Sequence, residues 1–330
     1  MLKRLAVFSV ISLIAASAAA QTFTMKLAVP TVNDPNHEFI KRYKVAIEKA
    51  SGGRIKAELY PGGQLGQPQQ VIEAVQLGSV ELFSIPPNFL RGVDPRFQVF
   101  DAAGVFDSIT HAHRSVTDPA FRKQILDMGV PKGVKGTAIW VYGGTAYAST
   151  KPLRSANDFA GKKVRILATR LEQALMKELK ATGVPIDYSQ VLPALQQGGV
   201  DAIRANIVAM GTAKFYTVAK YVTVIEDGYI PEVAFVSMAF LNRLPAELRV
   251  IVERTGPELE EEMLKFSVDF DASEAKRWQE NGAEVIRLSQ KEQAEFMRRA
   301  RAATEEFINA HPDLRPTYKL LTDSAAKHRK

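Results

Sequence analysis

An arginine inside an apolar, β-branched run is the residue of this chain best suited to binding chemistry. The run is Val164-Arg165-Ile166, and a strand of this composition is normally buried. A buried guanidinium needs an anionic partner, yet the surrounding region 159–223 has few acidic residues. A small carboxylate from outside would complete the site, because the planar fork of Arg165 can hold both of its oxygens. The alternative is a structural ion pair within the core.

Other residues could complete such a site. Asn206 follows a predicted strand, and its amide can donate and accept hydrogen bonds at once, although a turn asparagine is the alternative. Tyr188 could stack on a ligand or simply fill the core. Arg204 could supply a second positive group, with a surface or interlobe ion pair as the alternative. Four further candidates lie near predicted strand ends, with helix capping or core packing as their alternatives: Asn36, His37, Asn88 and Tyr142.

The sequence lacks the usual signs of catalysis or of a bound metal. The chain has no cysteine, and the pair His111-x-His113 has no carboxylate at a supporting spacing, so we expect no metal site. It also has no GxSxG, no GxGxxG and no phosphate-binding glycine loop. We therefore expect a binding protein without a cofactor rather than an enzyme. A secreted hydrolase that uses a carboxylate pair is the competing class.

Composition and the N-terminus indicate an exported globular protein. Apolar residues make up 46% and charged residues 24% of the 330 positions, which is typical of soluble domains. The net charge of +7 is spread along the chain without aromatic clustering, so we expect no nucleic-acid partner. Residues 1–20 have the basic start, the short apolar core and the Ala18-Ala19-Ala20 end of a cleavable signal peptide. These features predict a periplasmic protein, which we expect to be a monomer.

Strands and helices alternate along the chain in two sets. The first set runs to about residue 85 and the second begins near residue 137, and each has the β-α-β order of an α/β domain. Two such lobes would place a ligand cleft between them. The predicted strands are 23–29, 55–60, 80–85, 138–142, 163–167, 202–203, 232–240 and 283–286, and the predicted helices are 38–50, 71–77, 171–181, 191–197, 213–219, 257–279 and 291–308.

Several short motifs stand in a fixed order over nearly the whole mature chain. They include Ser51–Lys56, Tyr60–Gly66, Gln76–Glu81, Gly161–Ile166 and Lys214–Thr223. Each motif alone is weakly specific. The ordered set resembles the extracytoplasmic solute-binding proteins of tripartite ATP-independent periplasmic (TRAP) transporters, of the DctP type.

The resemblance implies a fold and a function. It implies a two-lobed, periplasmic binding protein-like α/β fold, in which each lobe is a sheet flanked by helices and a long helix from Pro257 crosses both lobes. We expect residues 21–142 plus 230–270 in lobe I and 143–229 plus 271–330 in lobe II. Such a receptor closes on a small organic acid and delivers it to the permease subunits in the membrane. A sensor-coupled binding protein would look identical in sequence.

The resemblance also assigns roles to individual residues. Arg165 falls on the carboxylate-binding arginine of the family, Asn206 on a ligand-contacting asparagine and Tyr188 on an aromatic residue that packs against the ligand. Two departures concern charge. Thr145 occupies the place where many members carry a second arginine, and Arg204 is an added cation in a stretch that usually has an acidic residue. We therefore expect a monocarboxylate, such as an aromatic or keto acid, rather than a dicarboxylate.

Overall fold

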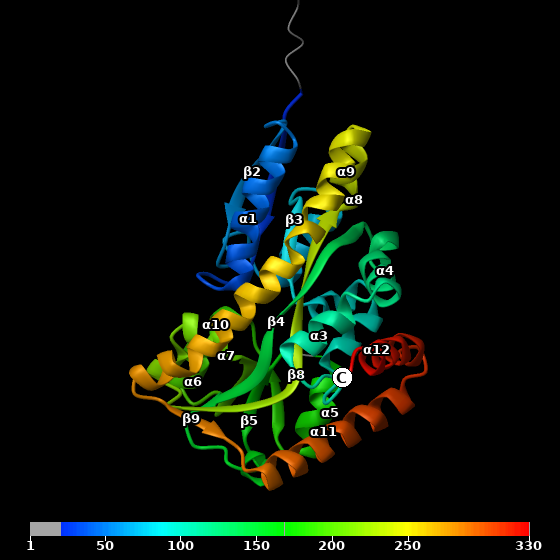
Figure 1. Ribbon diagram of the computed structural model, residues 1–330. Helices are drawn as coiled ribbons and strands as arrows, with labels where there is room; N and C mark the ends of the chain where they lie inside the picture. Colours follow the sequence, from blue (N-terminus) through cyan, green and yellow to red (C-terminus); the bar gives the residue numbers. More distant parts are fainter. Residues whose placement is uncertain (1–20, 168, 330) are drawn as a thin grey trace, which may run out of the picture.

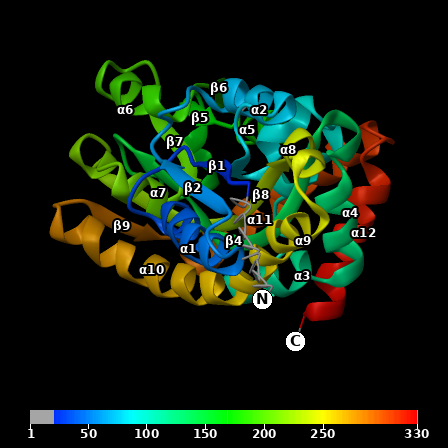
Figure 2. The same cartoon turned by 90° about the horizontal axis from the view of Figure 1, so that it is seen from above.

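The computed structural model describes residues 21–167 and 169–329, so the predicted signal peptide lies outside the described residues. Within these ranges the strands form one nine-stranded sheet in the order β2-β1-β3-β8-β4-β7-β5-β6, and β9 pairs with β8. Helices pack on both faces of this sheet (Figures 1 and 2). The α/β fold class predicted from the sequence is confirmed.

The first set of elements is a parallel β-α-β-α-β unit, as predicted. β1 (Phe23–Ala28) pairs in parallel with both β2 (Ile55–Tyr60) and β3 (Leu82–Ile85). The connections are α1 (Pro35–Ala50) and α2 (Pro68–Leu77), each with a proline in its first turn, where a missing N–H is tolerated. The carboxyl ends of β1 and β3 therefore lie together at one edge, where loops to the next helices begin.

A second parallel unit forms the other end of the sheet. β5 (Lys163–Ile166) lies between β6 (Thr182–Pro185) and β7 (Ala202–Asn206) and pairs in parallel with both. α5 (Arg170–Glu178) connects β5 to β6, and α6 (Tyr188–Gln196) connects β6 to β7. β6 was not predicted, because its glycine and proline obscure the strand pattern.

Two long antiparallel strands join these units. β4 (Val134–Ser149) and β8 (Tyr221–Ser237) pair along most of their length, and β8 also pairs with β3 while β4 pairs with β7. Their register shifts near Gly143-Gly144, because glycine favours local breaks in a strand. The predicted lobe boundaries at 142/143 and 229/230 fall beside these shifts, and they stay a prediction.

The long helix predicted from Pro257 crosses the molecule. α10 (Glu260–Glu280) follows a 3₁₀ turn that begins at Pro257, and it packs against α1 at one end and α7 (Ile207–Thr212) at the other (Figure 1). Near the C-terminus, α12 (Arg315–His328) was not predicted. It packs against α3 (Ile109–Val116), so a C-terminal helix assigned to lobe II contacts an element of lobe I.

One predicted helix is wrong in its position. Residues 213–219 contain only a 3₁₀ turn at Phe215–Thr217, whereas the helix lies earlier at Ile207–Thr212. It begins at Asn206, whose side chain caps it, and it is followed by Lys214 with a left-handed φ of 58°. The remaining elements are α4 (Pro119–Asp127), α8 (Met238–Arg243), α9 (Ala246–Thr255), β9 (Glu284–Arg287), α11 (Gln290–Ala310) and the 3₁₀ helices Pro87–Gly92, Pro95–Asp101, Val130–Lys132 and Ala156–Phe159.

The sheet buries apolar side chains on both faces. On one face Phe39 of α1 stacks on Trp140 of β4 with ring centroids 4.1 Å apart. On the other face Phe235 of β8 packs edge-on against Phe97. In the part of the chain that the structure describes, no helix combines the length and the apolar character needed to span a bilayer.

Candidate ligand-binding site

Arg165 is buried on β5, and its charge forms no ion pair within the described part of the chain. Its side chain is 1% exposed, and its Nε donates a hydrogen bond to the backbone oxygen of Ile186 at 2.9 Å. Among the described residues, Nη1 has no hydrogen-bond partner, and no carboxylate lies within 4 Å of the guanidinium. Burial lowers the pKa of Arg165, but a guanidinium still stays charged at neutral pH. The strand therefore holds a cation whose electrostatic environment is incomplete.

The guanidinium faces a cavity of about 70 Å³ that we call the Arg165 cavity. Its polar walls come from four other elements, namely Tyr142 on β4, Tyr188 on α6, Asn206 at the end of β7 and Glu232 on β8. Residues from both predicted lobes thus meet at one small cavity. The rest of the lining is almost entirely apolar: Pro30, Thr31, Pro68, Pro86, Phe89, Leu167, Ala205, Ala209 and Ile230.

Tyr188 is the aromatic wall nearest to the cation. The guanidinium carbon of Arg165 lies 5.7 Å from the centre of its ring, within the range of a cation–π contact. The other side of the tyrosine packs on Phe215, with ring centroids 5.5 Å apart. Its hydroxyl is buried, and it has no hydrogen-bond partner among the described residues. A ligand that reaches this hydroxyl would satisfy it.

Asn206 and Tyr142 line the cavity with polar groups that the protein already uses. The side-chain oxygen of Asn206 accepts from the backbone N–H of Val208 at 2.7 Å, and its amide donates to the backbone oxygen of Gly144 at 2.9 Å. The Tyr142 hydroxyl donates to Asp34 at 2.7 Å. These bonds fix both side chains. Asn206 and Tyr142 therefore define the shape of the cavity wall, besides being available for contacts to a ligand.

Three predicted site residues lie outside the lining of this cavity. Asn36 is buried behind it and donates to the backbone oxygen of Ser84 at 3.1 Å. His37 has the capping environment that was its alternative, because its backbone N–H donates to Asp34 at 2.9 Å and its Nδ1 accepts from the backbone of Asn33. Asn88 donates to Asp101 at 2.7 Å. Phe89, the next residue, lines the cavity instead.

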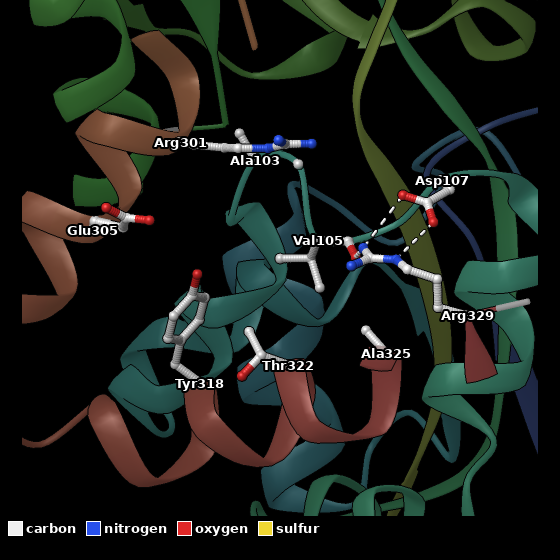
Figure 3. A pocket seen from close by; sticks show the side chains of 10 residues that line it. Ala103, Val105, Asp107, Arg301, Glu305, Tyr318, Thr322, Ala325 and Arg329 are labelled. Atoms are coloured by element: carbon white, nitrogen blue, oxygen red, sulfur yellow. Dashed lines mark hydrogen bonds and ion pairs between the residues drawn. The ribbon is translucent and has the colours of Figure 1, made fainter. Parts of the chain in front are cut away.

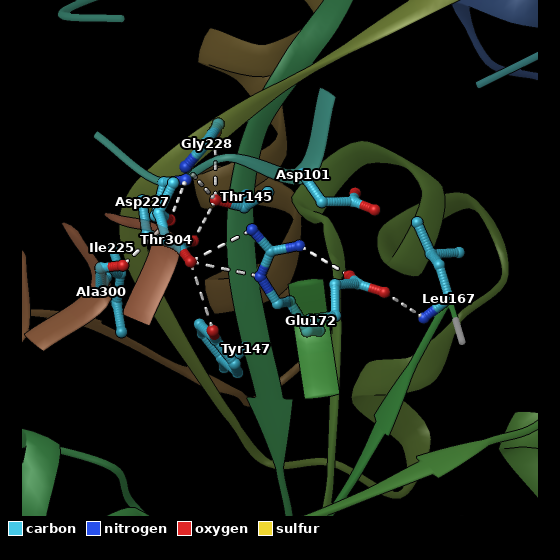
Figure 4. A network of polar contacts seen from close by, with 12 residues as sticks. Asp101, Thr145, Tyr147, Leu167, Glu172, Ile225, Asp227, Gly228, Ala300 and Thr304 are labelled. Carbon is cyan, nitrogen blue, oxygen red and sulfur yellow. Dashed lines mark hydrogen bonds and ion pairs between the residues drawn. The ribbon is translucent and has the colours of Figure 1, made fainter. Parts of the chain in front are cut away.

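Arg204 does not provide a second positive group in the cavity. Its Nη1 lies 2.8 Å from Glu172, and its Nη2 lies 3.1 Å from Asp227, both of which are buried (Figure 4). Thr145 and Tyr147 also donate to Asp227. Two carboxylates thus satisfy the guanidinium, and their charges help to hold its pKa well above the usual value despite burial. Arg204 thus forms a buried ion pair with acids of its own predicted lobe, rather than the surface or interlobe pair that was its alternative, and it does not line the cavity as predicted.

Glu232 lines the cavity and was missed by the sequence analysis. It is 4% exposed, and its Oε2 accepts from the side-chain amide of Asn36 at 3.1 Å. Burial, together with the nearby charge of Asp34, raises its pKa well above the usual value for a carboxyl. The sequence does contain an indication of this residue. Glu232 is an acid in an otherwise apolar extended run, just as Arg165 is a base in one, and a buried charge of either sign needs a partner.

A larger cavity of about 440 Å³ lies between α12, α11 and the loop 103–107 (Figure 3). Its charges are of both signs, and one cation is already paired, since Arg329 lies 2.8 Å from Asp107. Arg301 and Glu305 line the opposite side from exposed positions on α11. Because this cavity offers no buried, unpaired charge, we place the candidate ligand site at Arg165.

The histidine pair is divided between different partners. The Nε2 of His111 lies 2.8 Å from the backbone oxygen of Ala325, whereas His113 lies 3.4 Å from Glu261. Over residues 21–167 and 169–329, no group of three or more potential His, Asp or Glu ligands could hold a metal ion.

Known proteins resemble the chain in both sequence and structure. A family model described as bacterial extracellular solute-binding protein, family 7, matches residues 28–310. The C4-dicarboxylate-binding periplasmic protein DctP of Rhodobacter capsulatus is 29% identical over 297 residues, which cover 88% of this chain and 86% of the relative.

Two solved structures are similar over nearly their whole length. One is a TRAP periplasmic solute binding protein from Desulfovibrio salexigens with bound orotic acid, with a TM-score of 0.88 at 20% identity, covering 93% of this chain and 100% of the other. The second is a sugar acid binding protein from Advenella mimigardefordensis in complex with galactonate, with a TM-score of 0.88 at 22% identity, covering 94% and 99%. At these identities the likeness concerns the fold.

Proposed function

Since this chain belongs to family 7 of the bacterial extracellular solute-binding proteins and is a solute receptor of the TRAP type, we propose that it binds a small monocarboxylate in the Arg165 cavity. Delivery of the acid to the membrane permease subunits, from a periplasmic location, is part of the same proposal. Proteins of this family bind solutes and are not enzymes.

One observation carries the proposal, namely that Arg165 is buried and forms no ion pair with any residue that the structure describes. Moving a guanidinium out of water costs several kcal/mol unless charge and hydrogen bonds replace its hydration. The protein supplies one backbone oxygen to Nε and leaves Nη1 without a partner among the described residues. A carboxylate in the cavity would accept two parallel hydrogen bonds from this fork and neutralise it.

Closure of the receptor follows from where the walls originate. Arg165 and Tyr188 come from the second parallel unit, whereas Pro30, Pro86 and Glu232 come from the first or from the strand end beside it. A ligand that contacts both sets binds the closed arrangement more tightly than an open one. That difference in affinity is what shifts a two-state protein toward closure.

A single carboxylate fits the charge of the cavity better than two. Within the described residues, Arg165 is the one cation of its lining. A second carboxylate would lie in a wall made of apolar groups and the acid Glu232, where it would lose hydration without gaining a counter-ion. The Rhodobacter relative is named for C4-dicarboxylates, whereas orotic acid and galactonate, the ligands of the two similar structures, each carry one carboxylate.

A thermal-shift screen over monocarboxylates and dicarboxylates tests this function. A ligand present at one hundred times its Kd adds about 2.7 kcal/mol to the stability of the folded state, which raises the melting temperature measurably. We expect monocarboxylates to do so in the wild type and not in Arg165→Met. If dicarboxylates alone raise the melting temperature, the preference for one carboxylate is wrong. If no acid of either class does, the proposed function is wrong.

A further inference from the structure

Glu232 is held in one orientation with one oxygen left over. Its Oε2 accepts from Asn36, and Asn36 is itself fixed because its side-chain oxygen accepts from the hydroxyl of Ser84 at 2.5 Å. No hydrogen bond to Oε1 is found among the described residues, and the side chain lines the Arg165 cavity. The free oxygen is therefore available to whatever occupies that cavity.

Burial and the neighbouring charge of Asp34 both favour the neutral form of Glu232. Asp34 lies nearby and raises the pKa of Glu232 further after burial has done so. The other groups that line the cavity and can titrate or carry charge are Tyr142, Tyr188 and Arg165, and no cation of the described residues lies within 4 Å of this carboxyl. A carboxyl in this state carries a proton on one oxygen, so it can donate a hydrogen bond as well as accept one.

We propose that Glu232 determines ligand specificity by donating a hydrogen bond from its neutral carboxyl to an uncharged oxygen of the monocarboxylate that Arg165 holds. The oxygen would belong to a keto or a hydroxyl group, and the rest of the ligand would face the apolar wall. This inference rests on the proposed function and narrows its ligand to oxygen-bearing monocarboxylic acids. The two anchoring groups lie on strands separated by β4 and β7, so the ligand would join distant parts of the sheet.

The selectivity has a physical basis in an unsatisfied group. A site built to bond an uncharged oxygen rejects the analogue that lacks it, because the buried donor is then left without a partner. A second carboxylate in the same place is disfavoured by the negative charge of Asp34, and the described lining offers Arg165 as its one cation.

Matched ligands and variants test the inference by calorimetry. The probes are phenylpyruvate against 3-phenylpropionate and lactate against propionate, which differ in the uncharged oxygen alone. We expect the oxygen-bearing acid of at least one pair to bind at least tenfold more tightly to the wild type. Glu232→Gln should keep that preference, because its amide still donates, whereas Glu232→Leu should lose it and still bind the deoxy acid. Glu81→Gln, a change in a second buried acid outside the cavity, is the control and should behave as the wild type.

The pH profile gives a second readout that a structural role would not change. The preference of the wild type for phenylpyruvate over 3-phenylpropionate should fall as the pH rises through the pKa of Glu232, because an ionised carboxyl cannot donate to a keto oxygen, which can only accept. In Glu232→Gln it should stay constant from about pH 6 to about pH 9. Equal binding within both pairs, loss of the preference in Glu232→Gln, or its persistence in Glu232→Leu would each overturn the inference. The proposed function fails separately, if none of the screened acids binds.

Discussion

Arg165 and Arg204 are buried on adjacent strands, but they differ in whether the protein supplies carboxylates to their guanidinium groups. β5 and β7 pair directly, with Arg165 opposite Ile203, so the two arginines belong to the same part of the sheet. Arg204 contacts two buried carboxylates, whereas Arg165 donates to a single backbone oxygen. Burial of a cation therefore does not by itself identify a binding site. The decisive fact is whether the fold brings its own anions to that cation.

The network around Arg204 also explains a departure from the family pattern. Thr145 stands where many members of the family carry a second ligand-side arginine, and its hydroxyl donates to Asp227 and accepts from the backbone N–H of Gly228. Asp227 in turn is paired with Arg204, which is the added cation on the neighbouring strand. The second positive charge is thus present, but it lies inside a neutralised cluster instead of facing the ligand.

The largest loss of stability should come from replacing Arg204, the arginine that is paired with two carboxylates. Arg204→Met would leave Glu172 and Asp227 buried without a cation, and breaking a buried ion pair in this way typically costs about 3–5 kcal/mol of stability. Arg165→Met is the matched control, since it orphans no ion-paired carboxylate and should leave the free energy of unfolding nearly unchanged. Urea denaturation of both variants measures the difference. Equal destabilisation of the two variants would contradict the difference between a paired and an unpaired arginine.

A smaller change in free energy, in ligand binding rather than in folding, is expected when the planar guanidinium of Arg165 is replaced. Arg165→Lys keeps the charge but replaces the planar fork with a point charge, which cannot form two parallel bonds to a carboxylate. We expect binding of the best acid from the screen to weaken more than tenfold, or by about 1.4 kcal/mol, with little change in stability. Calorimetry measures the affinity. Unchanged affinity would show that Arg165 does not hold the ligand through its fork.

The hydroxyl of Tyr188 offers a finer test of the same cavity. It is buried without a partner among the described residues, so Tyr188→Phe should keep or slightly raise stability. If the ligand bonds this hydroxyl, affinity should fall about fivefold, or about 1 kcal/mol. Tyr142→Phe is the control with the reverse pattern, because its hydroxyl serves Asp34 and its loss should lower stability by about 1 kcal/mol. Loss of stability in Tyr188→Phe would contradict the assignment.

The pH dependence of stability offers a further test near Arg204, because the buried carboxyl of Asp101 belongs to the electrostatic environment of this arginine. Burial and the charge of Glu172 raise the pKa of Asp101 from 3.8 to about 7. The folded state therefore binds a proton that the unfolded state releases, and this contribution to stability is present at low pH and lost as the pH rises from about 4 through about 7. Asp101→Asn should reduce that decline.

The Asp101 test compares two stability profiles. Asp271 and Glu274, whose pKa values are raised to about 6 and about 7, contribute in the same direction and remain in the variant. The quantity to measure is therefore the difference between wild type and Asp101→Asn at each pH from about 4 to about 8. A difference that does not grow with pH would mean that Asp101 is ionised in the folded protein throughout.

Much of the fold was open to prediction because its signals are local. The β-α-β-α-β order of the first unit, the strand around Arg165 and the long helix after Pro257 were found from apolar periodicity and from glycine or proline at their ends. The full length of β4 was not predicted, because Gly143-Gly144 interrupts its apolar pattern. In the structure, hydrogen bonding to β8 continues the strand on both sides of these glycines. α12 was missed for a related reason, since its position depends on packing against α3.

The order of residues alone places a cation inside an apolar strand and so creates the need for an anionic partner. The fold selects which arginine finds that partner within the protein, because Asp227 reaches Arg204 through the pairing of β4 with β7 and β8, and Glu172 reaches it from α5. The same packing placed Glu232 on the wall of the Arg165 cavity and left His37 as part of a helix cap. Charge is a property of a residue, but neutralisation depends on distances between residues that are far apart in the chain.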